Sequence, residues 1–166
     1  FKVPRSFSYS SASVYKQCPR RWKYKYIDKL PDPTGEAALV GTFAHDVLEQ
    51  LCKEEPALRT EQKANEIARN NWSEFAERKD FKKLELDEDS KRNFRWKAWD
   101  AIKGLWRLEN PSQVEIEATE QRLSTSLLGV PFFGIVDRID RDEDGLVVVD
   151  YKTGKVRHEN LDQVLL

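Results

Sequence analysis

The chain has 166 residues, enough for a single domain with a hydrophobic core of its own. Apolar residues make up 39% of it and charged residues 34%, and the five tryptophans and eight phenylalanines exclude a disordered chain. The formal net charge of -1 excludes attraction to nucleic acid by overall charge alone, and two cysteines are too few for a disulfide scaffold.

The ends of the sequence carry no targeting signal, and we find no membrane span, internal repeat or low-complexity segment. We therefore expect an intracellular, cytoplasmic protein without a membrane partner. The sequence contains no methionine, and it ends in an apolar stretch that resembles the middle of a helix. We expect that residues are missing from both ends.

Positive charge is concentrated at the N-terminus. Between Phe1 and Pro31 there are eight lysines and arginines and one aspartate, a surplus of seven positive charges. Basic residues interleaved with aromatic ones are typical of a surface that contacts a phosphate backbone. The alternative is a solvated helix face. The residues predicted to bind nucleic acid are Arg20, Arg21, Lys23 and Lys25.

Hydrophobic periodicity predicts that residues 1–110 are mainly helical. The expected helices are Ser10 or Ser11 to Cys18, Arg20 to Ile27, Glu36 to Glu55, Thr60 to Lys79 and Lys91 to Glu109, with a charged connection from Lys82 to Ser90. Two helices carry clear apolar stripes, which are Leu39, Phe43, Val47 and Leu51 in one and Phe94, Ala98, Ile102, Leu105 and Trp106 in the other. Trp96 and Trp99 fall beside the second stripe, and we interpret them as packing residues rather than base-stacking platforms.

Residues 111–166 are predicted to form a catalytic sheet followed by a helix. Val114 to Leu128 is expected to be extended, Val130 to Arg141 reads as a strand, and Leu146 to Val149 is short and apolar enough for a buried strand. A last helix is expected from Glu159 or Asn160. Helices followed by strands and a helix predict an α/β or α+β domain with one sheet flanked by helices.

The two later strands place three charged residues on one face. Side chains alternate along a strand, so Asp150 and Lys152 point the same way. A four-residue loop from Asp142 to Gly145 places Asp137 opposite Asp150, and a two-residue Asp144-Gly145 turn places it opposite Lys152. Both loops have even length, and both keep the three charges together.

Two carboxylates and an ammonium group at the end of an apolar strand are costly to desolvate unless a ligand binds there. A hard divalent cation would satisfy the acids. The alternative is a solvated hairpin with an exposed ion pair, and the spacing alone favours neither. The sequence contains no motif of several other kinds of catalytic or binding site. It lacks a glycine-rich phosphate loop, G-x-S-x-G, H-E-x-x-H and paired C-x-x-C.

Four blocks in order resemble the PD-(D/E)xK nuclease superfamily, and within it the RecB-like exonuclease branch that includes CRISPR-associated relatives. The blocks are Phe7–Tyr24 with its Cys18-Pro-Arg-Arg, Gly41–Leu48 with His45, the pair Gly134–Asp140 and Val149–Gly154, and Gln163. They cover about half of the chain, and the helices from Thr60 to Asn110 match no motif. The resemblance implies a restriction-endonuclease-like core, with a central mixed β-sheet flanked by helices and an N-terminal helical region. It also implies a single nuclease domain over residues 1–166.

The resemblance also implies the ligands of a metal ion. His45, Asp137, Asp150 and the backbone carbonyl of Tyr151 would hold Mg²⁺ or Mn²⁺, and a second ion could enter with the DNA phosphate. Glu120 lies where relatives often have an acid before the first strand of the hairpin.

Two further residues have implied roles in catalysis. Lys152 would orient the attacking water and stabilise phosphate charge. Gln163 matches the start of the Q-x-x-x-Y motif that positions substrate and lysine; the tyrosine would fall past Leu166. In some relatives a cysteine placed like Cys18 joins three C-terminal cysteines around an iron–sulfur cluster, which this chain alone cannot build because it has two cysteines.

These features predict a metal-dependent DNA nuclease. We expect an exonuclease that cuts single-stranded or unwound DNA to 5′-phosphate products in DNA repair or recombination, with a helicase or a recombination or CRISPR protein as partner. One alternative is a non-catalytic DNA-binding or assembly module of the same fold. The other is a restriction-type endonuclease, which would cut closed circular DNA.

Overall fold

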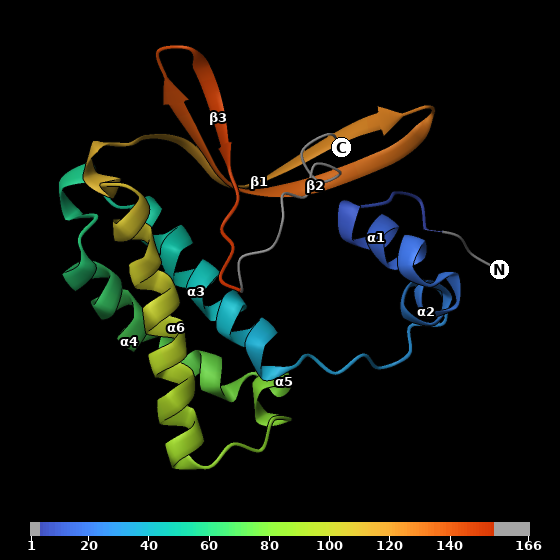
Figure 1. Ribbon diagram of the computed structural model, residues 1–166, viewed down its shortest axis with the longest axis horizontal. Helices are drawn as coiled ribbons and strands as arrows, with labels where there is room; N and C mark the ends of the chain where they lie inside the picture. Colours follow the sequence, from blue (N-terminus) through green and yellow to red (C-terminus); the bar gives the residue numbers. More distant parts are fainter. Residues whose placement is uncertain (1–3, 155–166) are drawn as a thin grey trace. The chain divides into compact units, whose positions relative to one another are not determined.

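The computed structural model describes residues 4–154, which form the helices and strands drawn in Figure 1. The described chain divides into two compact units. One contains residues 4–33 and 122–135, and the other contains Thr34–Gln121 and Val136–Gly154. Among residues 4–154, no helix combines the length and the apolar character that crossing a bilayer requires. That the whole chain is one nuclease domain stays a prediction.

The larger unit is built on a group of helices, of which α3 (Glu36–Cys52), α4 (Glu61–Glu77) and α6 (Glu88–Leu108) are the long ones. A short helix, α5 (Lys79–Lys82), joins α4 to α6, and 3₁₀ turns lie at Pro56–Leu58 and Pro111–Gln113. The helix starts follow capping chemistry, because Thr60 accepts a hydrogen bond from the Lys63 amide and Asp87 accepts one from the Ser90 amide. The predicted charged connection is therefore shorter than expected, since its ends belong to α5 and α6.

The core of this unit lies where α3 packs against α4 and α6, which run side by side in Figure 1. Both predicted apolar stripes are confirmed as buried, apart from Trp106, which is partly buried. An aromatic cluster fills the centre, in which the Phe94 ring lies 5.0 Å from Phe81 and 5.9 Å from both Trp72 and Phe75 between ring centroids. Interlocking rings of this kind hold the three long helices in one arrangement.

The strands are β1 (Glu115–Leu127), β2 (Val130–Asp142) and β3 (Gly145–Val149), in the order β1-β2-β3. Strands β2 and β3 are antiparallel, with Arg138 opposite Val149 and Asp142 opposite Gly145. The turn is therefore Glu143-Asp144, and the Asp142 carboxylate accepts hydrogen bonds from the amides of Asp144 and Gly145 at 2.9 Å each. An even-length loop is confirmed, with the register that places Asp137 toward Asp150.

The predicted class, a sheet combined with helices, is confirmed, but one strand differs from expectation. The apolar run of β3 was predicted to be buried, whereas Leu146, Val147 and Val148 are 59%, 41% and 63% exposed. Consecutive side chains point to opposite faces of a strand, so within residues 4–154 neither face of β3 is fully covered at these positions, and β3 is also an edge strand. The helix predicted near Glu159 lies outside the described residues.

The smaller unit contains α1 (Tyr9–Gln17) and α2 (Pro19–Trp22), and α2 continues as a π-helical turn at Lys23–Ile27. The second predicted helix thus has the expected length, with a wider last turn. Trp22 is buried here, and its indole N–H donates to Ser11 Oγ at 2.8 Å. The Phe7 ring stacks 6.2 Å from Trp22, and a parallel β-bridge joins Phe7 to Phe132. The N-terminal segment is therefore anchored by aromatic packing.

We predict that Phe94→Ala lowers the free energy of unfolding by about 3–5 kcal/mol, because it empties the centre of the aromatic cluster. Chemical denaturation measured by circular dichroism checks the value. Trp96→Ala, on the same helix but 65% exposed, is the matched control and should leave unfolding nearly unchanged. Equal losses for the two variants would contradict the packing described.

Candidate metal site

Three side chains from three different elements meet in the larger unit. His45 of α3, Glu120 of β1 and Asp137 of β2 each offer a ligand atom, and these atoms lie within 4.8 Å of one another. His45 Nδ1 and Asp137 Oδ1 are 3.4 Å apart, and their side chains are 29% and 13% exposed. The group is half-buried, so a ligand could reach it from solvent.

His45 is placed by the packing of α3. Its neighbours Ala44 and Val47 are buried in the core, so the imidazole lies at the edge of the buried face. One turn earlier is Gly41, where a Cβ atom would approach Thr153 Oγ1 to 2.9 Å. The absence of a side chain at Gly41 therefore lets α3 approach the segment that follows β3.

Glu120 has an unusual backbone conformation within β1. Its φ angle is +48°, in the left-handed region that non-glycine residues rarely adopt. Such a conformation costs about 1–3 kcal/mol and persists where the surroundings enforce it, often at functional sites. This conformation interrupts the regular alternation of side chains along β1 at Glu120, the residue of this strand that lies close to His45 and Asp137.

The backbone of Tyr151 closes the group. Its N–H donates to Asp137 Oδ2 at 2.6 Å, and its carbonyl oxygen lies 3.0 Å from His45 Nε2. The carbonyl predicted to be a metal ligand is therefore directly beside the imidazole predicted to be another. Both contacts fix the Asp-Tyr-Lys segment against α3 and β2.

The charges of the group shift its protonation. The contact with Asp137 raises the pKa of His45, although burial acts against this. Burial would raise the pKa of Asp137, but the hydrogen bonds from His45 and Tyr151 outweigh it, and the pKa falls. For Glu120, desolvation and then the charge of Asp137 raise the pKa. A carboxyl group whose pKa is raised by burial and by a neighbouring carboxylate is typical of a functional site.

Beneath the group lies a buried ion-pair network that sequence reasoning missed. Arg138 is 1% exposed and donates to both oxygens of Glu109 at 2.6 and 2.8 Å and to Asp140 at 2.8 Å. It also donates to the Tyr151 hydroxyl at 2.9 Å, which lies 3.5 Å from Cys52 Sγ. Burial raises the pKa of this tyrosine, so its hydroxyl stays neutral. The network thus anchors the residue whose backbone closes the metal group.

Alternation along the strands gave a signal for this network. If Asp137 faces the site, then Arg138 must face the opposite side, together with Asp140 and Tyr151. An arginine within a strand, with an aspartate two residues away on the same face, indicates an ion pair on that face. The partner from outside the hairpin, Glu109, has no local signal because it is far away in sequence.

Asp150 and Lys152 lie beside the group rather than within it. They form an ion pair with each other, and their side chains are 40% and 67% exposed. Asp150 is not among the acids that meet around His45 in the described chain, where Glu120 takes part instead. The positive charge of Lys152 nevertheless contributes to the lowered pKa of Asp137. The ligand role of Asp150 stays a prediction.

The remaining predicted residues are elsewhere. Gln163 lies outside the described residues. Cys18 is exposed in the smaller unit and Cys52 is buried in the larger one, and both are free thiols. The predicted nucleic-acid-binding residues Arg20, Arg21, Lys23 and Lys25 are all exposed. Two of them have acidic partners, since Lys23 pairs with Asp28 and Lys25 with Asp32, at 2.7 Å in each case.

The donor set fits a divalent cation. Two carboxylates and a backbone carbonyl are hard oxygen ligands that suit Mg²⁺ and Mn²⁺, and an imidazole nitrogen is accepted more readily by first-row ions such as Mn²⁺. His45, Glu120 and Asp137 would hold such an ion, and a ligand role of the Tyr151 carbonyl stays a prediction. Desolvation and then the charge of Asp137 raise the pKa of Glu120, and a bound cation would offset the repulsion between the two carboxylates.

We predict that His45 titrates above 6.5 in the metal-free protein and that Asp137→Asn lowers its pKa, because burial then acts without the carboxylate. The contact stabilises the metal-free fold where Asp137 is ionised and pH is below the ordinary pKa of histidine, and this stability is lost as pH rises through the raised pKa of His45. Metal binding needs neutral imidazole, so metal affinity should increase over the same pH range. NMR titration of the imidazole protons checks this, with His158→Gln to assign signals. An unchanged pKa in Asp137→Asn would contradict the contact.

We predict that Arg138→Met lowers the free energy of unfolding by about 3–5 kcal/mol, because it leaves buried Asp140 and partly buried Glu109 without a counter-charge. Thermal and chemical denaturation measure the loss. Arg141→Met is the matched control on the same strand, since Arg141 makes an exposed pair with Glu117 at 3.1 Å and should have no measurable effect. Similar stability of both variants would show that the buried network does not hold the strands.

Comparison with known proteins gives one match. Residues 6–165 match the model of the PD-(D/E)XK nuclease superfamily. No curated protein and no solved structure matches the chain. Members of this superfamily generally hydrolyse phosphodiester bonds of nucleic acids with divalent metals, which agrees with the donor set of the site. Because the match covers almost the entire chain and the fold has the mixed helix-and-sheet architecture expected, the chain belongs to the PD-(D/E)XK nuclease superfamily.

Proposed function

We propose that the protein is a metal-dependent DNA nuclease of the RecB-like exonuclease branch. It would hydrolyse phosphodiester bonds of single-stranded or unwound DNA to 5′-phosphate products. The observation that carries the proposal is the group of His45, Glu120 and Asp137, closed by the backbone of Tyr151, with Lys152 next in the chain. An intact metal-binding set favours an enzyme over a non-catalytic module of the same fold.

Some of these residues would bind the cation, and others would contact the phosphate of the substrate. His45, Asp137 and the Tyr151 carbonyl would form the permanent ligands, with Glu120 or Asp150 completing the set. A divalent cation bound there supplies Lewis acidity toward a phosphate oxygen and lowers the pKa of water. The Arg138 network would keep Tyr151, and hence its carbonyl, in place when the negatively charged substrate enters.

Lys152 is suited to act on the substrate. Its side chain is 67% exposed and paired with Asp150, so its ammonium group is held near the site and can exchange one anion for another. A compact ammonium group can stabilise charge on a phosphate and orient a water without requiring fixed planar geometry. We propose this role for Lys152, with Gln163 assisting it.

The exposed basic residues of the smaller unit would contact the DNA backbone. Arg20 donates from Nε to the Tyr24 hydroxyl at 2.8 Å, which leaves its terminal nitrogens for phosphate. Arg21 is exposed as well. A contact made by such residues is electrostatic, so DNA binding should weaken as salt increases. A helicase or recombination partner would supply unwound DNA.

The test is cleavage of end-labelled linear DNA in Mg²⁺, Mn²⁺ or EDTA by the wild type and by Asp137→Asn and Lys152→Ala. We expect metal-dependent cleavage in the wild type. Lys152→Ala should reduce the rate on the order of 100-fold or more, because a charge donor to the transition state is lost. Asp137→Asn should in addition weaken Mn²⁺ binding measured by calorimetry.

Asp144→Asn is the matched control, since Asp144 lies in the exposed turn of the same hairpin and should leave cleavage unchanged. Closed circular DNA of the same sequence separates an exonuclease from a restriction-type endonuclease, because an exonuclease requires an end. Salt-dependent DNA binding without cleavage in any metal would refute the proposal and favour the non-catalytic module.

A further inference from the structure

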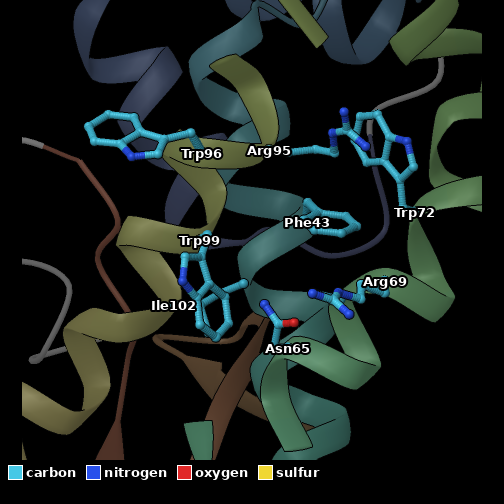
Figure 2. A pocket seen from close by; sticks show the side chains of 9 residues that line it. Phe43, Asn65, Arg69, Trp72, Arg95, Trp96, Trp99 and Ile102 are labelled. Carbon is cyan, nitrogen blue, oxygen red and sulfur yellow. The ribbon is translucent and has the colours of Figure 1, made fainter. Parts of the chain in front are cut away.

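A second candidate site lies among the long helices of the larger unit. A cavity of about 290 Å³ opens between α4 and α6, with Phe43 of α3 as its floor. Figure 2 shows Asn65, Arg69 and Trp72 on the α4 side and Arg95, Trp96 and Trp99 on the α6 side. We call this cavity the α4–α6 groove.

The walls of the α4–α6 groove are aromatic and partly exposed. Trp96 is 65% exposed, although it is three residues from Trp99 and two from the fully buried Phe94. The interpretation of Trp96 as a packing residue is therefore wrong, because its side chain lies outside the core. A large indole ring that borders a cavity and faces solvent is typical of a surface that stacks on a ligand.

The groove is also positively charged. Arg69 and Arg95 line it, and no aspartate or glutamate does. Within residues 4–154, neither arginine has a carboxylate at ion-pair distance, whereas the two other arginines of α4 and α6, Arg92 and Arg107, each form an ion pair. The Arg95 guanidinium instead stacks over the Trp72 ring at 5.1 Å. The two charges are therefore available to an anion.

The α4–α6 groove is separate from the metal group. Phe43 and His45 are two residues apart on α3, which corresponds to about 200° of rotation around the helix. Phe43 is buried beneath the groove, while His45 faces Asp137 and Tyr151. A ligand in the groove would therefore lie on the other side of α3 from the metal ligands.

We propose that the α4–α6 groove binds a nucleotide, with its base against Trp96 and Trp99 and its phosphate at Arg69 and Arg95. The indole faces suit a planar heteroaromatic ring, and the guanidinium groups suit phosphate oxygens. The amide of Asn65 offers both a donor and an acceptor to the edge of a base. The cavity is just below the size range of sites for drug-sized molecules, which fits one base rather than a larger ligand.

The nucleotide can come from two sources that share this chemistry. It can be one residue of a single DNA strand, which rests on the proposed nuclease function, or it can be a free nucleotide. In the first case the groove would hold the strand at a distance from the bond that is cut. In the second case it would be an effector site.

The test measures binding to the full chain in EDTA, where no cleavage occurs. The probes are a short oligothymidylate, the corresponding abasic strand and thymidine 5′-monophosphate. Their binding is measured by tryptophan fluorescence and anisotropy at low ionic strength. We expect Trp96→Ala to weaken oligothymidylate binding about 5-fold or more and to leave the abasic strand unaffected. Arg95→Ala should weaken binding of both strands, because it removes a phosphate contact.

The matched controls are on the same helix and outside the groove. Leu108→Ala replaces an apolar residue that is 87% exposed, and Arg107→Ala removes an exposed arginine. Both should bind every probe like the wild type. If Trp96→Ala weakens the binding of thymidine 5′-monophosphate, the groove is a site for a free nucleotide. If Trp96→Ala weakens only the binding of oligothymidylate, the groove is a contact for a DNA strand.

Unchanged affinity of Trp96→Ala and Arg95→Ala for all probes, with unchanged circular dichroism spectra, would overturn the inference. So would a wild type that binds none of the probes. The outcome is distinct from that of the proposed function. A wild type that binds oligothymidylate through the groove but cleaves no DNA would support the groove and refute the nuclease. A wild type that cleaves DNA, together with Trp96→Ala and Arg95→Ala variants of normal affinity, would support the nuclease and refute the groove.

Discussion

The buried guanidinium of Arg138 is the interaction on which the candidate site depends. It joins Glu109 at the end of the longest helix, Asp140 on its own strand and the Tyr151 hydroxyl. A buried ion pair contributes little net stability but fixes geometry, because any other arrangement leaves a charge without a partner. The side chain of Tyr151 is thereby held by the network, while its backbone contacts Asp137 and His45 of the candidate site.

Much of the fold could be predicted from the sequence because its signals are local. The apolar stripe of α3 shows in its helical period, and the hairpin register follows from an even-length turn. The exposure of Leu146 and Val148 could not be predicted, because a short apolar run is equally consistent with a buried strand and with an edge strand. What covers a strand depends on the rest of the fold.

The candidate site was predicted only in part, for a similar reason. The resemblance to the nuclease superfamily implied His45, Asp137 and Tyr151, which the structure brings together. The position of Glu120 depends on a single left-handed backbone angle, which no residue pattern in the strand specifies. The partnership of Arg138 with Glu109 joins residues 29 apart in sequence, and tertiary packing alone sets it. Trp96 shows the reverse case, since its place beside the apolar stripe agrees with its exposure, whereas its large aromatic side chain favoured an interpretation as a packing residue.

The close approach at Gly41 has a consequence for how the chain can vary in length. Gly41 and His45 are one helical turn apart, so the contact with Thr153 and the imidazole lie on the same face of α3. Deleting or inserting one residue between them would rotate the imidazole by about 100° relative to that contact. The interval between these two positions is therefore a fixed length in the protein, whereas the surface loops joining the helices can lengthen without disturbing the site.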